Sequence, residues 1–335
     1  MTVPGTDTAL MQVSNLGVEF QTRGGVARVL DDVAFTVHRG ETLGLVGESG
    51  CGKSMTALAM MRLIPTPPGR ITSGRVELDG RDLLAISEAE MRQHRGNRIS
   101  MIFQEPMTSL NPAYTVGDQI GEAVRLHQGL DRKAATQRAI EMLEAVGIPA
   151  ARTRVHEYPH QFSGGMRQRV MIAMALACKP GVLIADEPTT ALDVTVQAQI
   201  FDLISELRER TGTAVLLITH DMGAIAEMAD RVAVMYAGRI VEEGSVAEVL
   251  QSPLHPYTQG LIACAPGRRT AGFGEPLLEI PGTVPSLLER RGGCSFADRC
   301  SQVQVRCRTE LPPETVQDSG RRRVLCWLHV AEEAA

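Results

Sequence analysis

The segment at residues 47–54 constrains the fold of this chain more than any other part of its sequence. It reads Gly-Glu-Ser-Gly-Cys-Gly-Lys-Ser, follows an apolar stretch at residues 43–46, and precedes a helix-like stretch at residues 55–63. In such a loop, successive backbone N–H groups point at phosphate oxygens, and the helix N-terminus adds positive potential. A plain glycine turn is the alternative, but it needs neither the lysine nor the serine. We therefore expect a P-loop that binds ATP and Mg²⁺ through Gly47, Ser49, Gly50, Cys51, Gly52, Lys53 and Ser54, with Lys53 on the outer phosphates and Ser54 on the metal ion.

Two adjacent acids form a second candidate element. Asp186 and Glu187 follow the apolar residues 182–185, and ligands of α/β sheets bind at the carboxyl ends of the strands. Asp186 suits Mg²⁺, and Glu187 could orient or deprotonate an attacking water. In isolation the pair could equally cap a helix or lie in a solvated turn. Beside a P-loop, the pair favours ATP hydrolysis.

The hydrophobic pattern along the chain predicts an α/β fold. Short apolar or alternating segments predict strands at residues 11–20, 34–37, 42–46, 75–78, 182–185, 214–218 and 232–236. The first of these indicate an antiparallel β portion, and residues 116–146 have helical periodicity without a strand. The later strands alternate with helical segments near 195–210 and 222–229, which predicts a parallel sheet. We expect a P-loop NTPase with an antiparallel β subdomain, a helical insertion subdomain and a small Cys-rich C-terminal module.

Composition narrows the class of protein and its location. The chain has 335 residues, 44% of them hydrophobic, and a net charge of −5, which disfavours a nucleic-acid partner. No run of 18 apolar residues suggests a membrane span, and no basic start followed by an apolar segment suggests a secretory signal. These features predict a cytoplasmic protein. The composition shifts to Pro, Gly and Arg after residue 253, which places a boundary near residue 250.

Residues 162–169, Phe-Ser-Gly-Gly-Met-Arg-Gln-Arg, resemble the signature motif of ABC-transporter ATPases, whose common form is Leu-Ser-Gly-Gly-Gln. Alone, Ser-Gly-Gly would read as a linker, but it could also offer a hydroxyl and N–H groups to a γ-phosphate. Gln104 looks like the Q-loop of that family, residues 191–193 like its D-loop, and His220 like its switch histidine. The resemblance implies catalytic roles for Glu187, His220 and Gln104. It also implies Mg²⁺ binding by Ser54, Gln104 and Asp186, and nucleotide binding by Gln104, Ser163, Gly164, Gly165, Met166, Asp186 and Asp193.

The same resemblance raises two further expectations. Phe20 occupies roughly the place of the aromatic residue that stacks on adenine, although a phenylalanine in a core strand is an equal alternative. In this family two ATPase chains pair head to tail, as heterodimers or homodimers, so that each P-loop meets the signature motif of the other chain. The helical subdomain, at about residues 105–168, would dock on membrane subunits.

Three further segments resemble the ATPases of oligopeptide, dipeptide and nickel importers: residues 104–112, 255–258 and 293–300. Glu105 replaces the Asp of that group, and Met166 replaces the Gln of the common signature. The narrower resemblance implies an ATPase domain at 9–250 and an oligopeptide-transporter-type module at 251–335. It implies an ATPase on the cytoplasmic face of the inner membrane that powers peptide uptake with two permeases and an extracytoplasmic binding protein. An importer of nickel or another small solute, or a soluble ABC ATPase outside transport, is the alternative.

Four of the seven cysteines are clustered near the C-terminus. Cys294, Cys300, Cys307 and Cys326 have five, six and eighteen residues between them. Four thiolates suit Zn²⁺ or an iron–sulfur cluster and exclude Mg²⁺ and Ca²⁺, while free or disulfide-linked thiols are the third alternative. The resemblance implies a [4Fe-4S] cluster on these four residues. Cys51, Cys178 and Cys264 are interpreted as buried or loop residues.

Overall fold

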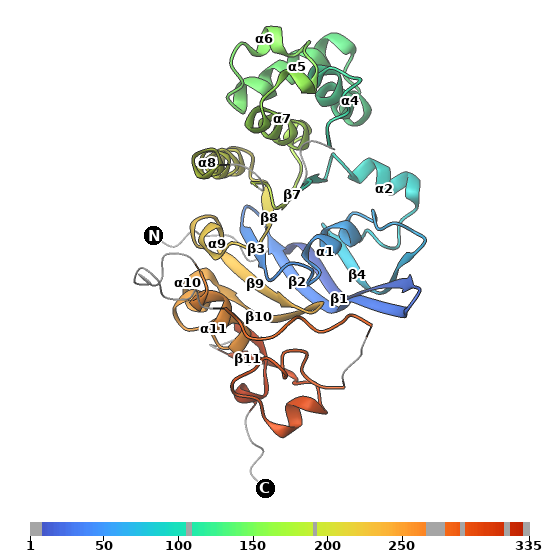
Figure 1. Ribbon diagram of the computed structural model, residues 1–335. Coiled ribbons are helices and arrows are strands. Elements are labelled where there is room, and N and C mark those ends of the chain that lie inside the picture. Colours follow the sequence, from blue (N-terminus) through green and yellow to red (C-terminus); the bar gives the residue numbers. More distant parts are fainter. Residues whose placement is uncertain are drawn as a thin grey trace. The chain divides into compact units, whose positions relative to one another are not determined.

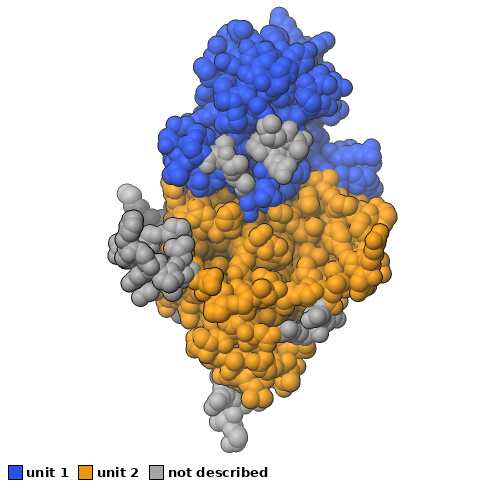
Figure 2. Space-filling model, in the orientation of Figure 1, with its two compact units in different colours: residues 1–11, 37–41, 85–216 blue, residues 12–36, 42–84, 217–335 orange. Residues whose placement is uncertain are grey.

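The computed structural model describes residues 9–104, 109–189, 193–265, 279–288, 292–317 and 322–330, and it divides into two compact units (Figure 2). Unit 1 is made of residues 1–11, 37–41 and 85–216, and unit 2 of residues 12–36, 42–84 and 217–335. Neither unit is a continuous stretch of sequence. Glu105 and the residues at 191–192 lie outside the described residues.

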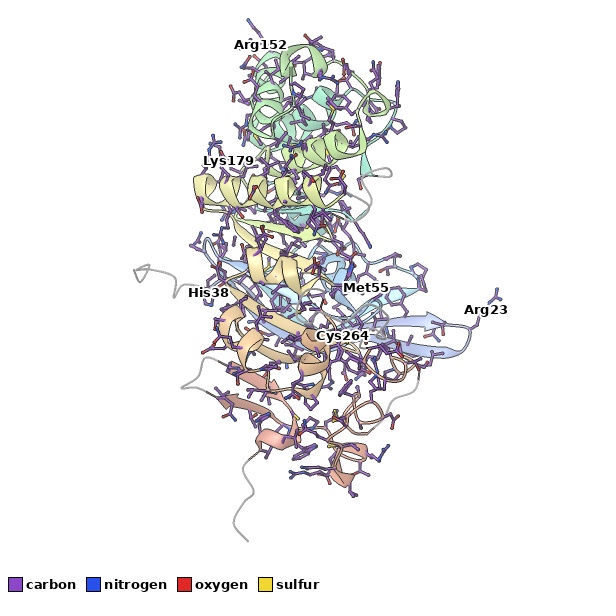
Figure 3. All side chains as sticks on the ribbon, turned by 60° about the vertical axis from the view of Figure 1, so that its left-hand side comes forward. Arg23, His38, Met55, Arg152, Lys179 and Cys264 are labelled. Carbon is purple, nitrogen blue, oxygen red and sulfur yellow. The ribbon has the colours of Figure 1, made fainter. Side chains whose placement is uncertain are left out.

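Unit 2 contains most of a four-stranded sheet with the order β2-β1-β4-β5. Its strands are β1 (Ala9–Thr22), β2 (Gly25–His38), β4 (Gly69–Leu78) and β5 (Arg81–Asp82). Alternate residues of β2 are buried, namely Val33, Phe35 and Val37, as expected for a sheet with one face on a core. Arg23 lies at the tip of the β1–β2 hairpin (Figure 3). The predicted strands are confirmed here but are longer than their apolar segments.

The second sheet of unit 2 carries the order β11-β12-β10-β9-β3. Its strands are β3 (Thr42–Val46), β9 (Arg231–Tyr236), β10 (Arg239–Ser245), β11 (Glu314–Gln317) and β12 (Arg322–Leu325). Strands β3 and β9 pair in parallel, which confirms that part of the predicted parallel sheet. The neighbouring pairs β9–β10, β10–β12 and β11–β12 are antiparallel. The sheet is therefore mixed, and its antiparallel edge includes two strands from beyond residue 250.

A tight turn reverses the chain between β9 and β10. Ala237 and Gly238 form this two-residue loop with φ values of 45° and 82°, the pattern of a type I′ hairpin turn. A side chain at Gly238 would lie 2.5 Å from the carbonyl oxygen of Val29, so only glycine fits. The helices of unit 2 are α1 (Lys53–Met60), α9 (Met222–Met228), α10 (Val246–Gln251) and α11 (Pro256–Ala263).

Unit 1 combines a small parallel sheet with a group of helices. Strands β6 (Ile99–Ile102) and β7 (Val182–Asp186) pair in parallel, and the first half of β8 (Ala214–Thr219) follows β7 in the strand order. The helices are α2 (Glu88–His94), α4 (Val116–Gln128), α5 (Arg132–Ala145), α6 (Ala151–Arg154), α7 (Gly164–Leu176) and α8 (Val194–Thr211). Helix α5 packs against both α4 and α7, and these helices lie together with α6 (Figure 1).

Local signals explain the helical part of unit 1. Thr115 and Asp131 cap α4 and α5 by accepting hydrogen bonds from the N–H groups of Asp118 and Ala134, and Gly129 ends α4 in the left-handed conformation. The predicted helical segment at 116–146 is thus a pair of helices. Among the described helices, none is long and apolar enough to cross a membrane.

Candidate nucleotide site

The loop at residues 47–52 lies between β3 and α1 in unit 2, as the sequence predicts. Gly50 and Gly52 adopt φ values of 79° and 113°, which residues with a side chain rarely adopt. A side chain at Gly47 would come 2.2 Å from the carbonyl oxygen of Met235. Each of the three glycines is therefore required by the backbone, so the motif is a structural loop and not an incidental run of small residues.

Lys53 begins helix α1 and turns its side chain back into this loop. Its side chain is buried, and Nζ donates to the carbonyl oxygens of Gly47 at 2.7 Å and Glu48 at 3.1 Å. No side chain among the described residues caps α1, and its first turn contains no acid. The positive end of the helix dipole and the held ammonium group together favour an anion such as a phosphate. Ser54 lies half-buried in the same first turn.

Two other predicted residues of unit 2 lie on separate elements. Phe20 is half-buried in β1, and a side chain at Gly69 would come 2.8 Å from its Cζ atom. This close packing fits the core-strand alternative, and stacking on adenine stays a prediction. His220 is exposed directly after β8 and precedes Asp221, which caps α9 by accepting a hydrogen bond from the N–H of Gly223 at 2.7 Å.

In unit 1, the ends of two parallel strands bring the predicted catalytic groups together. Ile102 of β6 pairs with Ala185 of β7, so the residues that follow both strands lie at one edge. There Gln104 Nε2 donates to Glu187 Oε2 at 3.0 Å. Asp186 is buried at the end of β7, whereas Glu187 is half-buried with a φ of 45°. Gln104 and the candidate base Glu187, which are 83 positions apart in the sequence, thus form a direct contact.

The signature segment is built around the start of helix α7. Ser163 caps this helix by accepting from the N–H of Met166 at 3.4 Å, and a side chain at Gly164 would meet nothing within 4 Å. Gly165 is more constrained, because its Cβ would lie 3.1 Å from Val196. The start of α7 is therefore open at Ser163 and Gly164. Asp193 caps α8 by accepting from the N–H of Val196 at 2.9 Å.

Gln168 is a residue that the sequence reasoning missed. It lies buried on α7, and its Nε2 donates to the carbonyl oxygen of Pro188 in a short hydrogen bond. Pro188 follows Glu187 directly, so the signature helix is linked to the segment that carries the candidate base. A glutamine on the buried face of a helix is the signal that could have identified it, because buried polar groups need partners.

The four C-terminal cysteines line one cavity of about 20 Å³ together with His255, Phe296 and Trp327. Burial raises the pKa of the Cys294 thiol to about 11, with smaller contributions from Cys307, Cys326 and Cys300. Among the described residues, however, no group of three or more His, Cys, Asp or Glu side chains is arranged to hold a metal ion. Four thiols are a suitable donor set for a soft metal, but the cavity has room for about one water-sized group. The predicted [4Fe-4S] site and Cys-rich module are therefore not confirmed.

The remaining cysteines are placed as the sequence predicts. Cys51 and Cys178 are buried, and burial raises the pKa of both thiols. Cys264 ends helix α11 (Figure 3).

Comparisons with known proteins identify the family of the chain. Residues 30–190 match the ABC transporter family, and residues 241–307 match the oligopeptide/dipeptide transporter C-terminal region. A probable peptide ABC transporter ATP-binding protein of Sinorhizobium fredii is 53% identical over 95% of this chain and 94% of its own length. The dipeptide transport ATP-binding protein DppD of Bacillus subtilis is 50% identical, again over 95% of this chain and 94% of its own length.

The fold has a solved counterpart. A dimeric bacterial ABC transporter cassette superposes with a TM-score of 0.63 and 26% identity, over 70% of this chain and 98% of that one. Three observations identify the family: the P-loop with its buried lysine, the contact between Gln104 and Glu187, and relatives that match almost the whole chain. The chain belongs to the ATP-binding proteins of the ABC transporter family and is an ATP-hydrolysing enzyme.

Proposed function

We propose that this chain is the ATP-hydrolysing subunit of an importer that takes up di- or oligopeptides across the cytoplasmic membrane. The observation that carries this proposal is the extent of the likeness to peptide-transport proteins, which covers 95% of the chain and includes residues beyond the ATPase motifs. The match to the oligopeptide/dipeptide transporter C-terminal region, at 241–307, favours peptides over nickel or another small solute.

In the proposed mechanism, the P-loop holds the phosphates of ATP. Backbone N–H groups within residues 47–54 would bind phosphate oxygens, and Lys53 would contact the outer phosphates. Ser54, Asp186 and Gln104 are the proposed ligands of Mg²⁺, which would supply positive charge to the phosphate oxygens. His220 would contact the γ-phosphate.

Glu187 is the proposed general base. Gln104 donates to Oε2 of this carboxylate at 3.0 Å, and the carboxylate so held is the group proposed to accept a proton from water. The hydrogen bond therefore orients the base and also connects it to the Mg²⁺ ligand Gln104. Phe20 is the proposed adenine contact.

The complete site is proposed to need a second ATPase chain, in a heterodimer or a homodimer. Ser163, Gly164, Gly165 and Met166 would bind the partner's nucleotide, and Asp193 would lie at the same interface. The open start of α7 supports this role, because a phosphate could approach the N–H groups there without a steric barrier.

The assembly is proposed to lie at the cytoplasmic face of the membrane. An ATPase domain at 9–250 would dock its helical subdomain, residues 105–168, on two permease subunits, and an extracytoplasmic binding protein would deliver the peptide. The chain itself would be a peripheral protein, which agrees with the lack of a described helix able to span a membrane.

For the C-terminal module at 251–335, we propose a [4Fe-4S] cluster on Cys294, Cys300, Cys307 and Cys326, with Zn²⁺ as the alternative. What supports this proposal is that all four thiols line one cavity. Iron, sulfide and zinc analysis of protein purified without oxygen tests it. About four irons and four sulfides per chain are expected, and a metal-free protein would remove this site.

Peptide uptake is the test of the main proposal. Cells lacking this gene should lose uptake of labelled di- or tripeptides and regain it with the intact gene, but not with the Glu187→Gln variant. A matched control is uptake of a single amino acid, which should be unchanged. Normal peptide uptake in the deletion strain, with a defect for a different solute, would contradict the peptide assignment but leave the ATPase assignment intact.

A further inference from the structure

Arg299 connects the C-terminal region to the P-loop inside unit 2. Its guanidinium group forms two hydrogen bonds with the Glu48 carboxylate, from Nη1 to Oε2 at 2.7 Å and from Nη2 to Oε1 at 2.9 Å. The Arg299 side chain is only 5% exposed, compared with 27% for Glu48. This is a two-point charged pair with a fixed geometry, of the kind that arginine forms best.

Other groups fix the position of Arg299. Nε donates to the carbonyl oxygen of Pro281 at 2.9 Å, and Nη2 donates to that of Ile280 at 3.2 Å. The guanidinium carbon lies 5.7 Å from the ring centre of Tyr236 and 5.8 Å from that of Phe296. A buried cation with this many partners cannot move without leaving some of them unpaired.

The backbone around Arg299 belongs to the cysteine segment. The N–H of Arg299 donates to the carbonyl of Phe296, and the N–H of Ala297 donates to that of Cys294, both at 3.0 Å. Cys294 in turn donates to the carbonyl of Cys307 at 2.8 Å. The conformation of this segment therefore determines where the guanidinium group lies.

Glu48 is held at three points, two of them by the C-terminal region. Its N–H donates to the hydroxyl oxygen of Tyr257 at 2.8 Å, and its carboxylate accepts from Arg299. Its carbonyl accepts from Lys53 Nζ at 3.1 Å and from the N–H of Cys51 at 3.3 Å. The same residue that Arg299 holds therefore also holds the phosphate-binding lysine.

From these contacts we propose that Arg299 is a positioning residue of the ATP site. By holding the Glu48 carboxylate, it fixes the peptide unit whose carbonyl orients Lys53 and whose neighbours supply the phosphate-binding N–H groups. Nucleotide affinity then depends on the segment at residues 293–300, which lies about 250 positions from the P-loop in sequence. The proposal rests on ATP binding at the P-loop and not on the identity of the transported solute.

Binding of a fluorescent ATP analogue with Mg²⁺ to the purified full chain tests the proposal. Arg299→Met removes the charge and keeps the stem, and should raise the Kd about tenfold, as expected for loss of a buried charged pair. Arg299→Lys keeps the charge but cannot form both hydrogen bonds of the planar guanidinium group, so its Kd should lie between those of the parent and Arg299→Met. Glu48→Gln should weaken binding to a similar extent. The double variant should be no weaker than either single variant, because both changes remove the same contact.

Arg308→Met is the matched control. Arg308 lies in the same region, is exposed, and pairs with Asp298 at 2.7 Å, so the Kd should stay within twofold of the parent. Should Arg299→Met unfold the C-terminal region, Glu48→Gln still tests the contact from the P-loop side. Unchanged affinity in Glu48→Gln, or additive effects in the double variant, would overturn the proposal. Absence of nucleotide binding by the parent chain would instead contradict the P-loop assignment itself.

Discussion

Replacement of Glu187 by glutamine separates its proposed catalytic role from its structural contacts. The glutamine has the same shape, and its carbonyl oxygen can still accept the hydrogen bond that Gln104 Nε2 now donates to the carboxylate at 3.0 Å. The variant therefore keeps the positioning of the Q-loop residue and loses only the ability to take a proton from water. General-base catalysis contributes about 10²- to 10⁴-fold to a rate, so kcat should fall by about that factor.

The assay is ATP turnover by the assembled transporter in proteoliposomes, with nucleotide affinity measured on the same preparation. The Kd for Mg-ATP should change by less than about twofold, because the phosphates are held by the P-loop and not by Glu187. ATP should then stay bound and unhydrolysed, and the ATPase dimer should stay closed. Turnover at the parent rate would remove Glu187 from the mechanism, and a large rise in Kd would show that its main role is binding.

Three other substitutions test separate parts of the structure. Lys53→Ala should abolish nucleotide binding and turnover together, and unchanged affinity would contradict the P-loop assignment. Gln104→Ala should lower kcat by about tenfold or more, because it removes the charge-assisted hydrogen bond that orients Glu187. The fall in kcat should be smaller than the fall in Glu187→Gln. Arg322→Met should lower the free energy of unfolding by about 3 kcal/mol or more in urea titrations, because it leaves the buried Glu242 carboxylate without its cation.

The P-loop and its flanking elements could be predicted from the sequence because their signals are local. The strand at residues 42–46 is a continuous apolar run, and all five of its residues are buried in β3. The glycines and Lys53 follow at fixed positions. The proximity of Gln104 and Glu187 could also be predicted from the sequence. Each residue follows a strand-like segment, and parallel strands bring their carboxyl ends to one edge of a sheet.

Strand β10 could not be predicted in the same way. Its sequence, Arg-Ile-Val-Glu-Glu-Gly-Ser, places Glu242 and Glu243 where a strand of this buried sheet would normally be apolar, yet both are buried. Their charges are balanced by Arg322 and Arg323 of β12, which lie 80 positions away. No local window of sequence contains both halves of these ion pairs. The pairing of β10 with β12 could therefore be established only from the structure.

The pairing of buried polar groups also connects the region beyond residue 250 to the P-loop. Glu242 accepts hydrogen bonds from the N–H groups of Leu254 and His255 as well as from Arg322, so the turn between α10 and α11 is fixed by a group on β10. That turn leads into α11, where Tyr257 receives the N–H of Glu48. Buried polar groups cost free energy unless they are paired, and here the partners come from beyond residue 250. The C-terminal region thus adds two strands to the sheet of unit 2 and holds the P-loop through hydrogen bonds to Glu48. The residues that follow the shift in composition near residue 250 therefore pack within the same unit as the P-loop.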